Sequence, residues 1–503
     1  MKLRGNPDGA ALIAFALTIP VLLAALVYAI MVRQPWYDEF YTLYVTRTDW
    51  SWSEAFARHW LTDNHPPLFY ALSRATSWLG QTVEARRLAN LLIAVASLLI
   101  AVAAVRGSSR SRLIAICYFL FIITPPPFLP LAAELRSYFL SYCSMSVLVL
   151  VLVLIWQDEE PPKAVRKAVL TLATLVAFNT HIITSLIAGA LVLPFAAAAL
   201  FKRDYQRFRT LLIPALAGGT LFLVTVAVQF PLWIANTSDF WIPASAEQAL
   251  WAIRMILQAV GVANPVILLG GACGIGVVVS QAFRDRKMSA SLETMLLLGI
   301  GTVLACVLIA AVQIWRPSVI PKYLTCLIPC IAMIVSLGLS QLIRRTWQGV
   351  GPLLLTVAAG MSLFAMVGNA SAVADIPGWD GTAAAVARQV ARCKGTVVHT
   401  DPYWNSYVMG LKPADNAHVV PYSYEFMARR HGFAVEPLSS RRVSQDCPTL
   451  FWVEHISRTP DAETVLMQER KRGFAISRLE IYSVGKGWIA STEPLGGAPG
   501  KAD

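Results

Sequence analysis

Residues 11–45 read ALIAFALTIPVLLAALVYAIMVRQPWYDEFYTLYV, in which a long apolar run leads into an aromatic segment with two adjacent acids. The run, residues 11–32, is long enough to cross the roughly 30 Å hydrocarbon core of a bilayer as a helix. It is longer than the apolar part of a signal peptide and has no small-residue cleavage site after it. We therefore expect an uncleaved first membrane span, with Asp38 and Glu39 at its outer end.

The composition of the whole chain is that of a polytopic α-helical membrane protein. Of 503 residues, 56% are hydrophobic and 14% are charged, and the mean hydropathy is +0.56. A formal charge of +12 would also suit nucleic-acid binding, but the Lys and Arg residues lie mostly in short loops between apolar runs. That placement is typical of the positive-inside rule, so we interpret the charge as membrane topology.

Ten further apolar runs predict about eleven transmembrane helices in total. The basic loops fall on the side of the N-terminus, which predicts a cytoplasmic N-terminus and, with an odd count, a C-terminal tail outside. Two runs are nearly continuous around His181; we favour a tight hairpin, because one long helix would put later basic loops on opposite sides. The further spans are approximately 89–105, 112–130, 137–156, 164–179, 181–201, 210–232, 263–281, 293–314, 322–343 and 349–371, and the basic loops are 106–112, 202–209, 284–287 and 344–345.

Two outer loops interrupt the predicted transmembrane domain, residues 1–375. The first, residues 33–88, contains an amphipathic segment at 51–61 that suits a helix lying in the membrane interface, with tryptophans that also suit plain aromatic anchors. The second comprises residues 233–254.

The polar tail, residues 376–503, predicts a small periplasmic α/β domain with its own core. Helical patterns cover 379–392 and 460–472, and strand patterns cover 395–400 and 449–455. Of eight cysteines, only Cys393 and Cys447 lie in this tail, and an oxidising compartment would allow them to pair. Their distance cannot be judged from the sequence, so the pairing is left open.

Asp38 and Glu39 are the first candidate site residues. At the outer end of a span a carboxyl group is partly desolvated, and its pKa can shift into a range that suits proton transfer. The alternative is an ordinary acidic cap on a loop helix. The pair alone does not decide between these interpretations.

Four other polar motifs lie on predicted outer turns, so all five face one side of the membrane. The Pro pair after His65 fixes the entry into a helix, and a histidine at a helix N-terminus suits an anion site, with a plain turn as the alternative. Arg136 offers a bidentate fork that suits phosphate, whereas an arginine that merely snorkels is the alternative. The four motifs are residues 63–70 (DNHPPLFY), 134–138 (ELRSY), 179–181 (NTH) and 316–323 (RPSVIPKY).

The order of these motifs resembles the GT-C glycosyltransferases. Shared features are the acidic pair after the first span, His-Pro-Pro-Leu, Arg-x-Tyr, Thr-His and a late basic residue followed by Tyr. The chain is similar to the bacterial group that uses polyprenyl-phosphate sugars and is related to protein O-mannosyltransferases, lipid A aminoarabinose transferases and lipopolysaccharide galacturonosyltransferases. The resemblance covers roughly residues 11–345 and implies a GT-C fold, a lipid-phosphate sugar donor and inversion at the anomeric carbon.

The resemblance also implies roles for individual residues. Asp38 would be the base that takes the proton of the acceptor hydroxyl, and Glu39 would orient the substrate or Asp38. Neutralising the departing lipid phosphate would supply most of the rate gain. The phosphate-binding candidates are His65, Arg136, Arg316 and Lys322, and the pocket candidates are Glu134, Tyr138, His181 and Tyr323.

Some features depart from the family pattern. Lys322-Tyr stands where many relatives have Arg-Tyr, which keeps the charge but loses the bidentate fork. His65 stands before Pro-Pro as in the O-mannosyltransferases, and this disfavours aminoarabinose as the donor sugar. The tail has no β-trefoil repeat, so a protein acceptor gains no support. Some relatives use a divalent metal, but no tight ligand spacing is seen here, and a metal stays unassigned.

The leading hypothesis is an inverting glycosyltransferase of the bacterial inner membrane that moves one sugar from polyprenyl phosphate to a glycolipid or polysaccharide in the periplasm. Its expected partners are the donor lipid, an envelope glycan or glycolipid acceptor and the bilayer, without nucleic acid. A flippase or carrier for a lipid-linked sugar is the competing class, although it would need its site open to both faces. A polymerase or ligase with a diphosphate-linked donor is the third.

Overall fold

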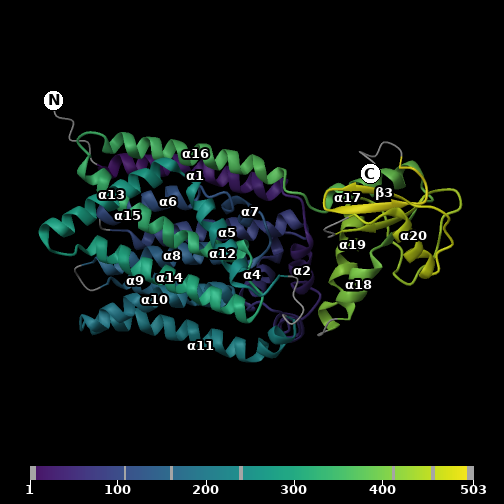
Figure 1. Ribbon diagram of the computed structural model, residues 1–503, viewed down its shortest axis with the longest axis horizontal. Helices are drawn as coiled ribbons and strands as arrows, with labels where there is room; N and C mark the ends of the chain where they lie inside the picture. The colour runs from purple at the N-terminus through teal and green to yellow at the C-terminus, as the bar shows by residue number, and fades with distance from the viewer. Residues whose placement is uncertain are drawn as a thin grey trace. The chain divides into compact units, whose positions relative to one another are not determined.

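The computed structural model describes residues 7–106, 109–158, 162–236, 242–410, 414–454 and 459–495. The chain forms two compact units (Figure 1). The helical unit comprises Met1–Met31 and Trp60–Val373, and the mixed unit comprises Val32–His59 and Ala374–Asp503. The sequence analysis divided the chain only between residues 375 and 376, whereas in the structure the segment Val32–His59 also belongs with the C-terminal tail.

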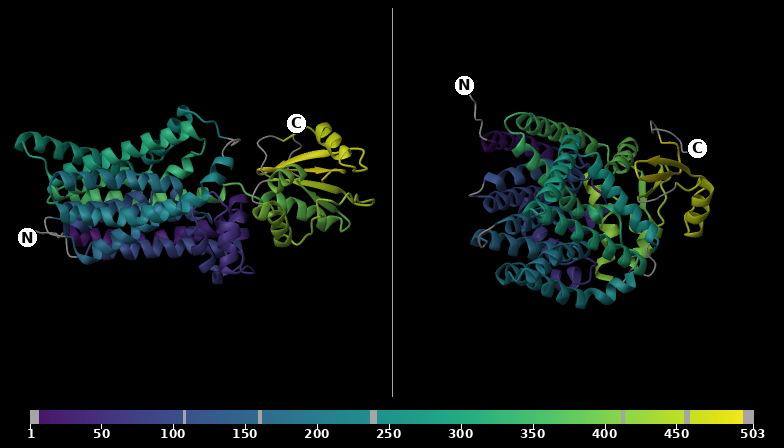
Figure 2. Two further views of the ribbon diagram at one scale, coloured as in Figure 1. Left: turned by 90° about the horizontal axis from the view of Figure 1, so that it is seen from below. Right: turned by 60° about the vertical axis from the view of Figure 1, so that its left-hand side comes forward.

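The helical unit is a bundle of long helices (Figure 2). Within the described ranges, nine helices are long and apolar enough to cross a membrane. The other two predicted spans correspond to shorter helices, α6 (Ser109–Ile122) and α9 (Ala164–Thr180), so the count of eleven stays a prediction. The nine are α1 (Pro7–Val32), α5 (Val83–Ala104), α8 (Ser137–Gln157), α10 (Ile182–Phe201), α11 (Tyr205–Asn236), α13 (Pro265–Asp285), α14 (Ala290–Trp315), α15 (Ile328–Arg345) with the preceding turn η3 (Pro321–Leu327), and α16 (Gly351–Ala374).

Shorter helices connect these spans. The predicted segment 51–61 is helical, as α3 (Trp52–Glu54) and the π-helix η1 (Ala55–Trp60), and all of it up to His59 belongs to the mixed unit. Its place in a membrane interface stays a prediction. An amphipathic helix that the sequence analysis did not anticipate, α12 (Ala246–Gly261), begins in the predicted second outer loop and extends beyond it. Other short helices of the helical unit are α4 (Leu68–Ala75), η2 (Ser77–Leu79) and α7 (Phe128–Ala132).

Helix α8 is the centre of the bundle. Its sequence is apolar all round, a pattern that suits a helix surrounded by protein, and every side chain from Ser137 to Trp156 is buried. It packs against α5, α9, α10, α14 and α15. Residue 136, at the N-terminus of α8, is therefore held on the most enclosed helix of the unit.

The predicted hairpin at His181 is confirmed, because α9 and α10 are separate helices that pack against each other. His181 itself is extended, with φ −157° and ψ 142°, and this breaks the helix.

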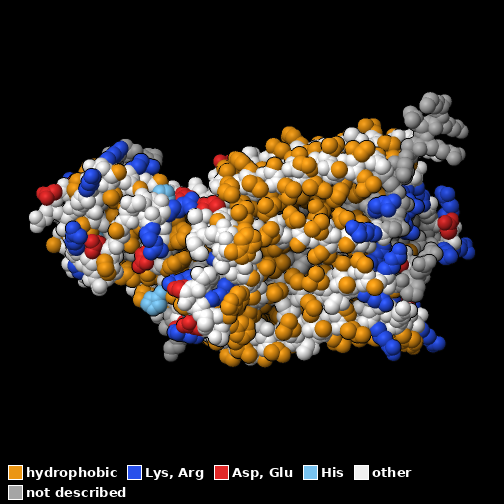
Figure 3. Space-filling view, turned by 180° about the vertical axis from the view of Figure 1, so that it is seen from behind, with side chains coloured by type: hydrophobic (Ala, Val, Ile, Leu, Met, Phe, Trp, Pro, Cys, Tyr) orange, Lys and Arg blue, Asp and Glu red, His pale blue; other side chains and the backbone are white. Residues whose placement is uncertain are grey.

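The predicted basic loops lie together at one end of the helical unit. Lys202 Nζ lies 2.6 Å from Glu293 Oε2, and Arg110 donates to Ser291 Oγ over 2.9 Å. Arg345 likewise pairs with Gln281. Figure 3 shows Lys and Arg side chains gathered at this end, with an apolar band over the helices beside it. The alternation of basic and non-basic loops along the sequence therefore predicted correctly which loops lie at the same end of the bundle.

The mixed unit contains a four-stranded sheet of order β1-β2-β4-β3. β1 (Val397–Thr400) and β2 (Thr449–Val453) are parallel, whereas β4 (Gly487–Ser491) is antiparallel to β2 and to β3 (Glu480–Val484). The helices of this part are α17 (Asp380–Arg392), α18 (Pro402–Met409), η4 (Ala414–Asn416), α19 (Val419–Arg430) and α20 (Ala462–Lys471). The two strands and two helices expected in the tail are present, while β3, β4, α18 and α19 were not anticipated.

Helices cover both faces of this sheet. On one face Phe451 and Val453 of β2 pack with Val465 of α20. On the other, the ring of Trp452 lies 4.9 Å from that of Tyr424 in α19. The tail is thus a three-layered α/β unit.

Within the mixed unit, helix α2 (Tyr37–Val45) packs on the helices of the C-terminal tail through its aromatic residues. They recur at helical spacing, so they form one face, which the sheet-covering helices bury. The aromatic character of the segment that carries the acidic pair is therefore explained by packing. The ring centroids lie 4.4 Å apart for Tyr37 and Trp404, 5.0 Å for Phe40 and Trp379, and 5.4 Å for Tyr44 and Tyr422.

A disulfide joins Cys393 and Cys447, with their Cα atoms 5.8 Å apart, so the pairing left open by the sequence is present. It crosslinks positions 54 residues apart. We expect Cys393→Ser to lower the free energy of unfolding of the mixed unit by about 2–4 kcal/mol, because the crosslink restricts the unfolded chain. Hydrogen exchange of the β2 amides measures this, with Cys273→Ser, an exposed free cysteine, as control. Equal protection with and without reductant would contradict it.

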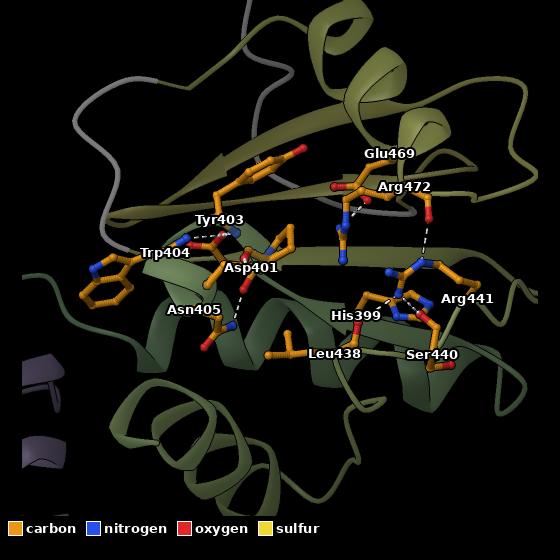
Figure 4. A network of polar contacts seen from close by, with 12 residues as sticks. His399, Asp401, Tyr403, Trp404, Asn405, Leu438, Ser440, Arg441, Glu469 and Arg472 are labelled. Atoms are coloured by element: carbon orange, nitrogen blue, oxygen red, sulfur yellow. Dashed lines mark hydrogen bonds and ion pairs between the residues drawn. The ribbon is translucent and has the colours of Figure 1, made fainter. Parts of the chain in front are cut away.

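A polar network in the mixed unit is structural (Figure 4). Asp401 follows β1 at its carboxyl end, where open α/β sheets often bind ligands. Its carboxylate instead accepts hydrogen bonds from the backbone N–H groups of Tyr403 (2.7 Å) and Trp404 (3.2 Å), which cap α18. Arg441 Nε donates to the carbonyl of Arg472 over 2.7 Å and ties the segment before β2 to the end of α20. We assign no site to this network.

Candidate functional site

Side chains from four segments that are distant in sequence meet in the helical unit. They come from the turn before α4, the N-terminus of α8, the break between α9 and α10, and η3. Helices α5 and α8 run from these four segments towards the basic loops. The four segments therefore lie at the end of the helical unit opposite the basic loops. We call these residues the polar cluster: Asp63, His65, Tyr70, Glu134, Arg136, Tyr138, His181, Lys322 and Tyr323.

Asp63 organises the first segment. Its Oδ2 atom accepts hydrogen bonds from the His65 backbone (3.3 Å), from His65 Nδ1 (3.1 Å) and from the Tyr70 hydroxyl (2.5 Å). Burial alone would raise the pKa of Asp63, but the hydrogen bond and charge of His65, the charge of Arg136 and the Tyr70 bond together lower the pKa well below its usual range. Asp63 is therefore a carboxylate, and His65 presents Nδ1–H to it.

This contact fixes the tautomer of His65. When Nδ1 carries the proton, Nε2 is the nitrogen that can accept or take up a further proton. The prolines at 66 and 67 lead directly into α4, so the ring is held at a rigid turn.

His181 and two tyrosines form an aromatic wall. The His181 ring lies 4.8 Å from Tyr323, 5.7 Å from Tyr138 and 5.2 Å from His65. His181 Nδ1 accepts a hydrogen bond from the backbone N–H of Ile183 over 3.2 Å, which caps α10 and leaves the ring proton on Nε2. The helix break thus serves to orient a histidine within the cluster.

A buried cation, Arg136, and a partly exposed one, Lys322, lie beside this wall. The Lys322 ammonium lies 4.7 Å from the centre of the Tyr138 ring and forms an ion pair with the buried carboxylate of Glu134. The Arg136 guanidinium lies 5.8 Å from the same ring centre and is only 7% exposed. Two carboxylates, those of Asp63 and Glu134, therefore balance two cations in a site with little access to water.

Two buried amides that the sequence analysis overlooked position the cluster. Asn90 of α5 donates to the carbonyl oxygens of Ala132 (2.9 Å) and Glu134 (2.7 Å). Gln229 of α11 donates to the carbonyl of His65 over 3.0 Å. A lone amide within an apolar span was the available signal, because such groups need a partner inside a bundle. Asp63 and Tyr70 were likewise not singled out, although their motif was.

The acidic pair lies in the mixed unit. Glu39 is fully buried, and its carboxylate accepts a hydrogen bond from the backbone N–H of Trp36 over 3.3 Å at the first turn of α2. Gln34 Oε1 accepts from the backbone N–H of Gly378 over 3.0 Å and anchors the same turn. Asp38 is half-buried in that turn. Glu39 thus has a capping role, which the sequence analysis considered as the alternative for the pair.

Arg316, like Asp38 and Glu39, is not among the described residues that form the polar cluster. Its guanidinium lies 5.9 Å from the centre of the Trp315 ring, and it belongs to the segment before η3. No group of three or more His, Cys, Asp or Glu side chains suited to a metal is found among the described residues, and a metal stays unassigned.

The chain was compared with known proteins by sequence and by structure. Its sequence matches no protein-family model and no curated protein. Among solved structures it is similar to ArnT from Cupriavidus metallidurans in the apo state, with a TM-score of 0.55 and 15% identity over 96% of this chain and 98% of that one. For ArnT bound to undecaprenyl phosphate the TM-score is 0.52, with 15% identity over 98% and 100% of the two chains.

An oligosaccharyltransferase from Archaeoglobus fulgidus, in complex with zinc and sulfate, aligns with a TM-score of 0.44 and 10% identity over 93% of this chain and 73% of that one. The likeness to ArnT extends over nearly the full length of both chains. The chain therefore has the GT-C fold of a polytopic membrane protein.

Proposed function

We propose that this protein is an inverting glycosyltransferase that moves one sugar from a polyprenyl-phosphate donor to a hydroxyl group of a glycolipid or polysaccharide. The observation that carries the proposal is the polar cluster: the buried Arg136 and the partly exposed Lys322 meet His65 beside an aromatic wall in a bundle with the GT-C fold. The ArnT that shares this fold has been solved with undecaprenyl phosphate, a ligand of the proposed donor class.

The cluster has the chemistry that a lipid phosphate needs. Arg136 offers a planar fork for two phosphate oxygens, and Lys322 offers a point charge. In the low dielectric of a buried site, such fixed charges stabilise a leaving phosphate far more than water does. Because Glu134 already neutralises Lys322, we propose that Lys322 moves its ammonium from Glu134 to the phosphate when the donor binds.

The proposed reaction is a single displacement. The acceptor oxygen attacks the anomeric carbon, the bond from that carbon to the phosphate oxygen breaks, and its electron pair remains on the phosphate. The acceptor proton goes to Asp38, which we assign as the base from the sequence motif. We assign Glu39 as a positioning residue, because its cap holds the turn that carries Asp38.

We place the reaction on the periplasmic face of a bacterial inner membrane, with the N-terminus cytoplasmic. This orientation rests on the basic loops, which the positive-inside rule puts in the cytoplasm. A glycolipid or polysaccharide of the cell envelope is the acceptor that this location favours, ahead of a protein.

Lys322→Gln tests the phosphate site directly. We expect it to lower kcat/KM for the polyprenyl-phosphate sugar by about 10- to 100-fold, because one of two cations facing the leaving group is lost. Arg316→Gln removes an equal charge outside the cluster and should change kcat/KM less than threefold. Consumption of the donor by purified variants is measured by chromatography of extracted lipids. Equal losses in both variants would remove Lys322 from the phosphate site.

Asp38→Asn tests the base. We expect transfer to fall by about 10²- to 10⁴-fold while binding of polyprenyl phosphate stays intact, since an amide cannot take the acceptor proton. Calorimetric titration with polyprenyl phosphate measures binding in the same preparation. A variant with unaltered transfer would show that another group is the base.

A further inference from the structure

An apolar cavity of about 310 Å³ lies in the helical unit between α1, α5, α6 and α8. Helix α1 contacts one neighbour within the lining of this cavity and another beyond it. The rings of Phe15 in α1 and Phe119 in α6 are 5.0 Å apart, and Arg87 of α5 donates to the carbonyl of Ile30 over 3.1 Å. Side chains of both α1 and α5 line the cavity.

Half of the α5 residues that line the cavity are small. Ala94, Ser97 and Ala101 recur at helical spacing and line it together. In membrane proteins such residues usually let two helices approach closely. Here these small residues face the cavity, so we expect a bound molecule, and not another helix, to contact them.

The chemistry of the cavity favours a hydrocarbon chain as the guest. Its lining is almost wholly apolar, and a buried water needs two to four polar partners. The lining on α1 extends from Leu12 to Leu26, about 21 Å along the helix axis. One leaflet of the hydrocarbon core is about 15 Å thick, so an acyl chain fits this length.

Two cations mark one end of the cavity. Arg106, at the end of α5, and Arg112 of α6 both line it. Basic pockets between membrane helices bind the headgroups of anionic lipids. Asn90, which contacts the Glu134 loop, lies 16 residues before Arg106, about 24 Å along α5. A phosphate at these arginines is therefore far from the polar cluster and is not the reacting phosphate of the sugar donor.

We propose that this cavity binds one anionic glycerophospholipid, with an acyl chain between α1 and α5 and its phosphate at Arg106 and Arg112. The lipid would fill the space between α1 and the rest of the bundle and would stabilise the helical unit. The proposal is independent of the sugar-transfer reaction.

The test measures the lipid carried by the full-length protein. Protein purified in a mild detergent is extracted, and its phospholipids are quantified by mass spectrometry. After delipidation, phosphatidylglycerol or phosphatidylcholine is titrated in and binding is followed by native mass spectrometry. We expect about one phosphatidylglycerol per chain and a preference for it over phosphatidylcholine.

Three variants test whether the lipid binds in this cavity. Ala101→Phe fills the cavity and should abolish retention of the lipid. Leu99→Phe adds a ring to the same helix at a residue that is 63% exposed and outside the lining, and it should retain the lipid. The double variant R106Q/R112Q leaves the cavity intact, so it also serves if A101F does not fold, and it should lose about fivefold in anionic preference for each arginine.

Absence of phospholipid from the wild-type protein would overturn the proposal. If the wild-type protein instead carries polyprenyl phosphate and A101F loses it, the cavity binds a lipid of the donor class. This result would also overturn the proposal. Equal retention by A101F and L99F, or an unchanged anionic preference in R106Q/R112Q, would place any bound lipid elsewhere.

Discussion

Arg136→Gln is expected to reduce sugar transfer by about 10²- to 10³-fold, the largest effect we anticipate in the polar cluster. Arg136 is buried at the N-terminus of the most enclosed helix of the bundle, and its charge faces Asp63. Removing it takes away the bidentate partner of the proposed lipid phosphate. It also removes a positive charge that acts on the Asp63 carboxylate, so the charge balance of the site becomes less favourable to an anion.

Arg136→Lys is the matched control for this experiment. It keeps the positive charge but loses the planar fork, so we expect an intermediate rate. Initial rates with purified protein give kcat and KM, and thermal unfolding of each variant separates lost activity from lost structure. If R136Q is well folded and transfers sugar at the wild-type rate, the phosphate does not bind at this position.

Glu454→Gln is expected to stabilise the mixed unit by up to about 4–5 kcal/mol above pH 8. Glu454 follows β2 and is 1% exposed, and its Oε1 atom accepts a hydrogen bond from Trp452 Nε1 over 2.8 Å. Burial raises the pKa of Glu454 to about 8, against hydrogen bonds from Trp452 and Thr382 that lower it. A glutamine keeps the shape and the acceptor but never ionises.

The direction of the pH dependence follows from this raised pKa. The unfolded carboxyl ionises near pH 4.5, whereas the folded one holds its proton to about pH 8. Between these values the folded state binds more protons than the unfolded state, so stability falls as the pH rises. Below about pH 4.5 both states are protonated, and E454Q should match the wild type.

Hydrogen exchange of the β2 and β4 amides, measured from pH 5 to 9, gives the local free energy of opening for both proteins. The difference between them should grow with pH and level off above 8. Two parallel curves would show that Glu454 is already ionised in the folded protein.

Patterns that are local in sequence predicted much of the fold. The uniform apolarity of residues 137–156 marks α8, and the extended backbone at His181 matches the expected hairpin. A hairpin signal in the tail was nevertheless overlooked: Gly485, with φ +61°, and residue 486 form a two-residue turn between β3 and β4.

The residues that meet in the candidate site were anticipated in part. Motif order singled out His65, Arg136 and Lys322, and the structure brings all three to the polar cluster. Contacts between distant segments have no local signature, which is why Asn90 and Gln229 were not anticipated.

The same limit applies to the segment Val32–His59, which belongs with the C-terminal tail. Its aromatic spacing indicates a buried helical face but not what covers that face. Trp379, whose ring contacts that of Phe40 on this face, lies more than 300 positions away along the chain.

The most direct test of the central claim is donor turnover by the purified wild-type protein. It is incubated with a panel of polyprenyl-phosphate sugars, the matching diphosphate-linked sugars and envelope glycolipid acceptors, and the extracted lipids are analysed by mass spectrometry. We expect one monophosphate-linked sugar to be consumed, with release of polyprenyl phosphate and an acceptor heavier by one sugar of inverted anomeric configuration. Protein that is folded and binds polyprenyl phosphate but consumes no donor, or only diphosphate-linked donors, would contradict the account.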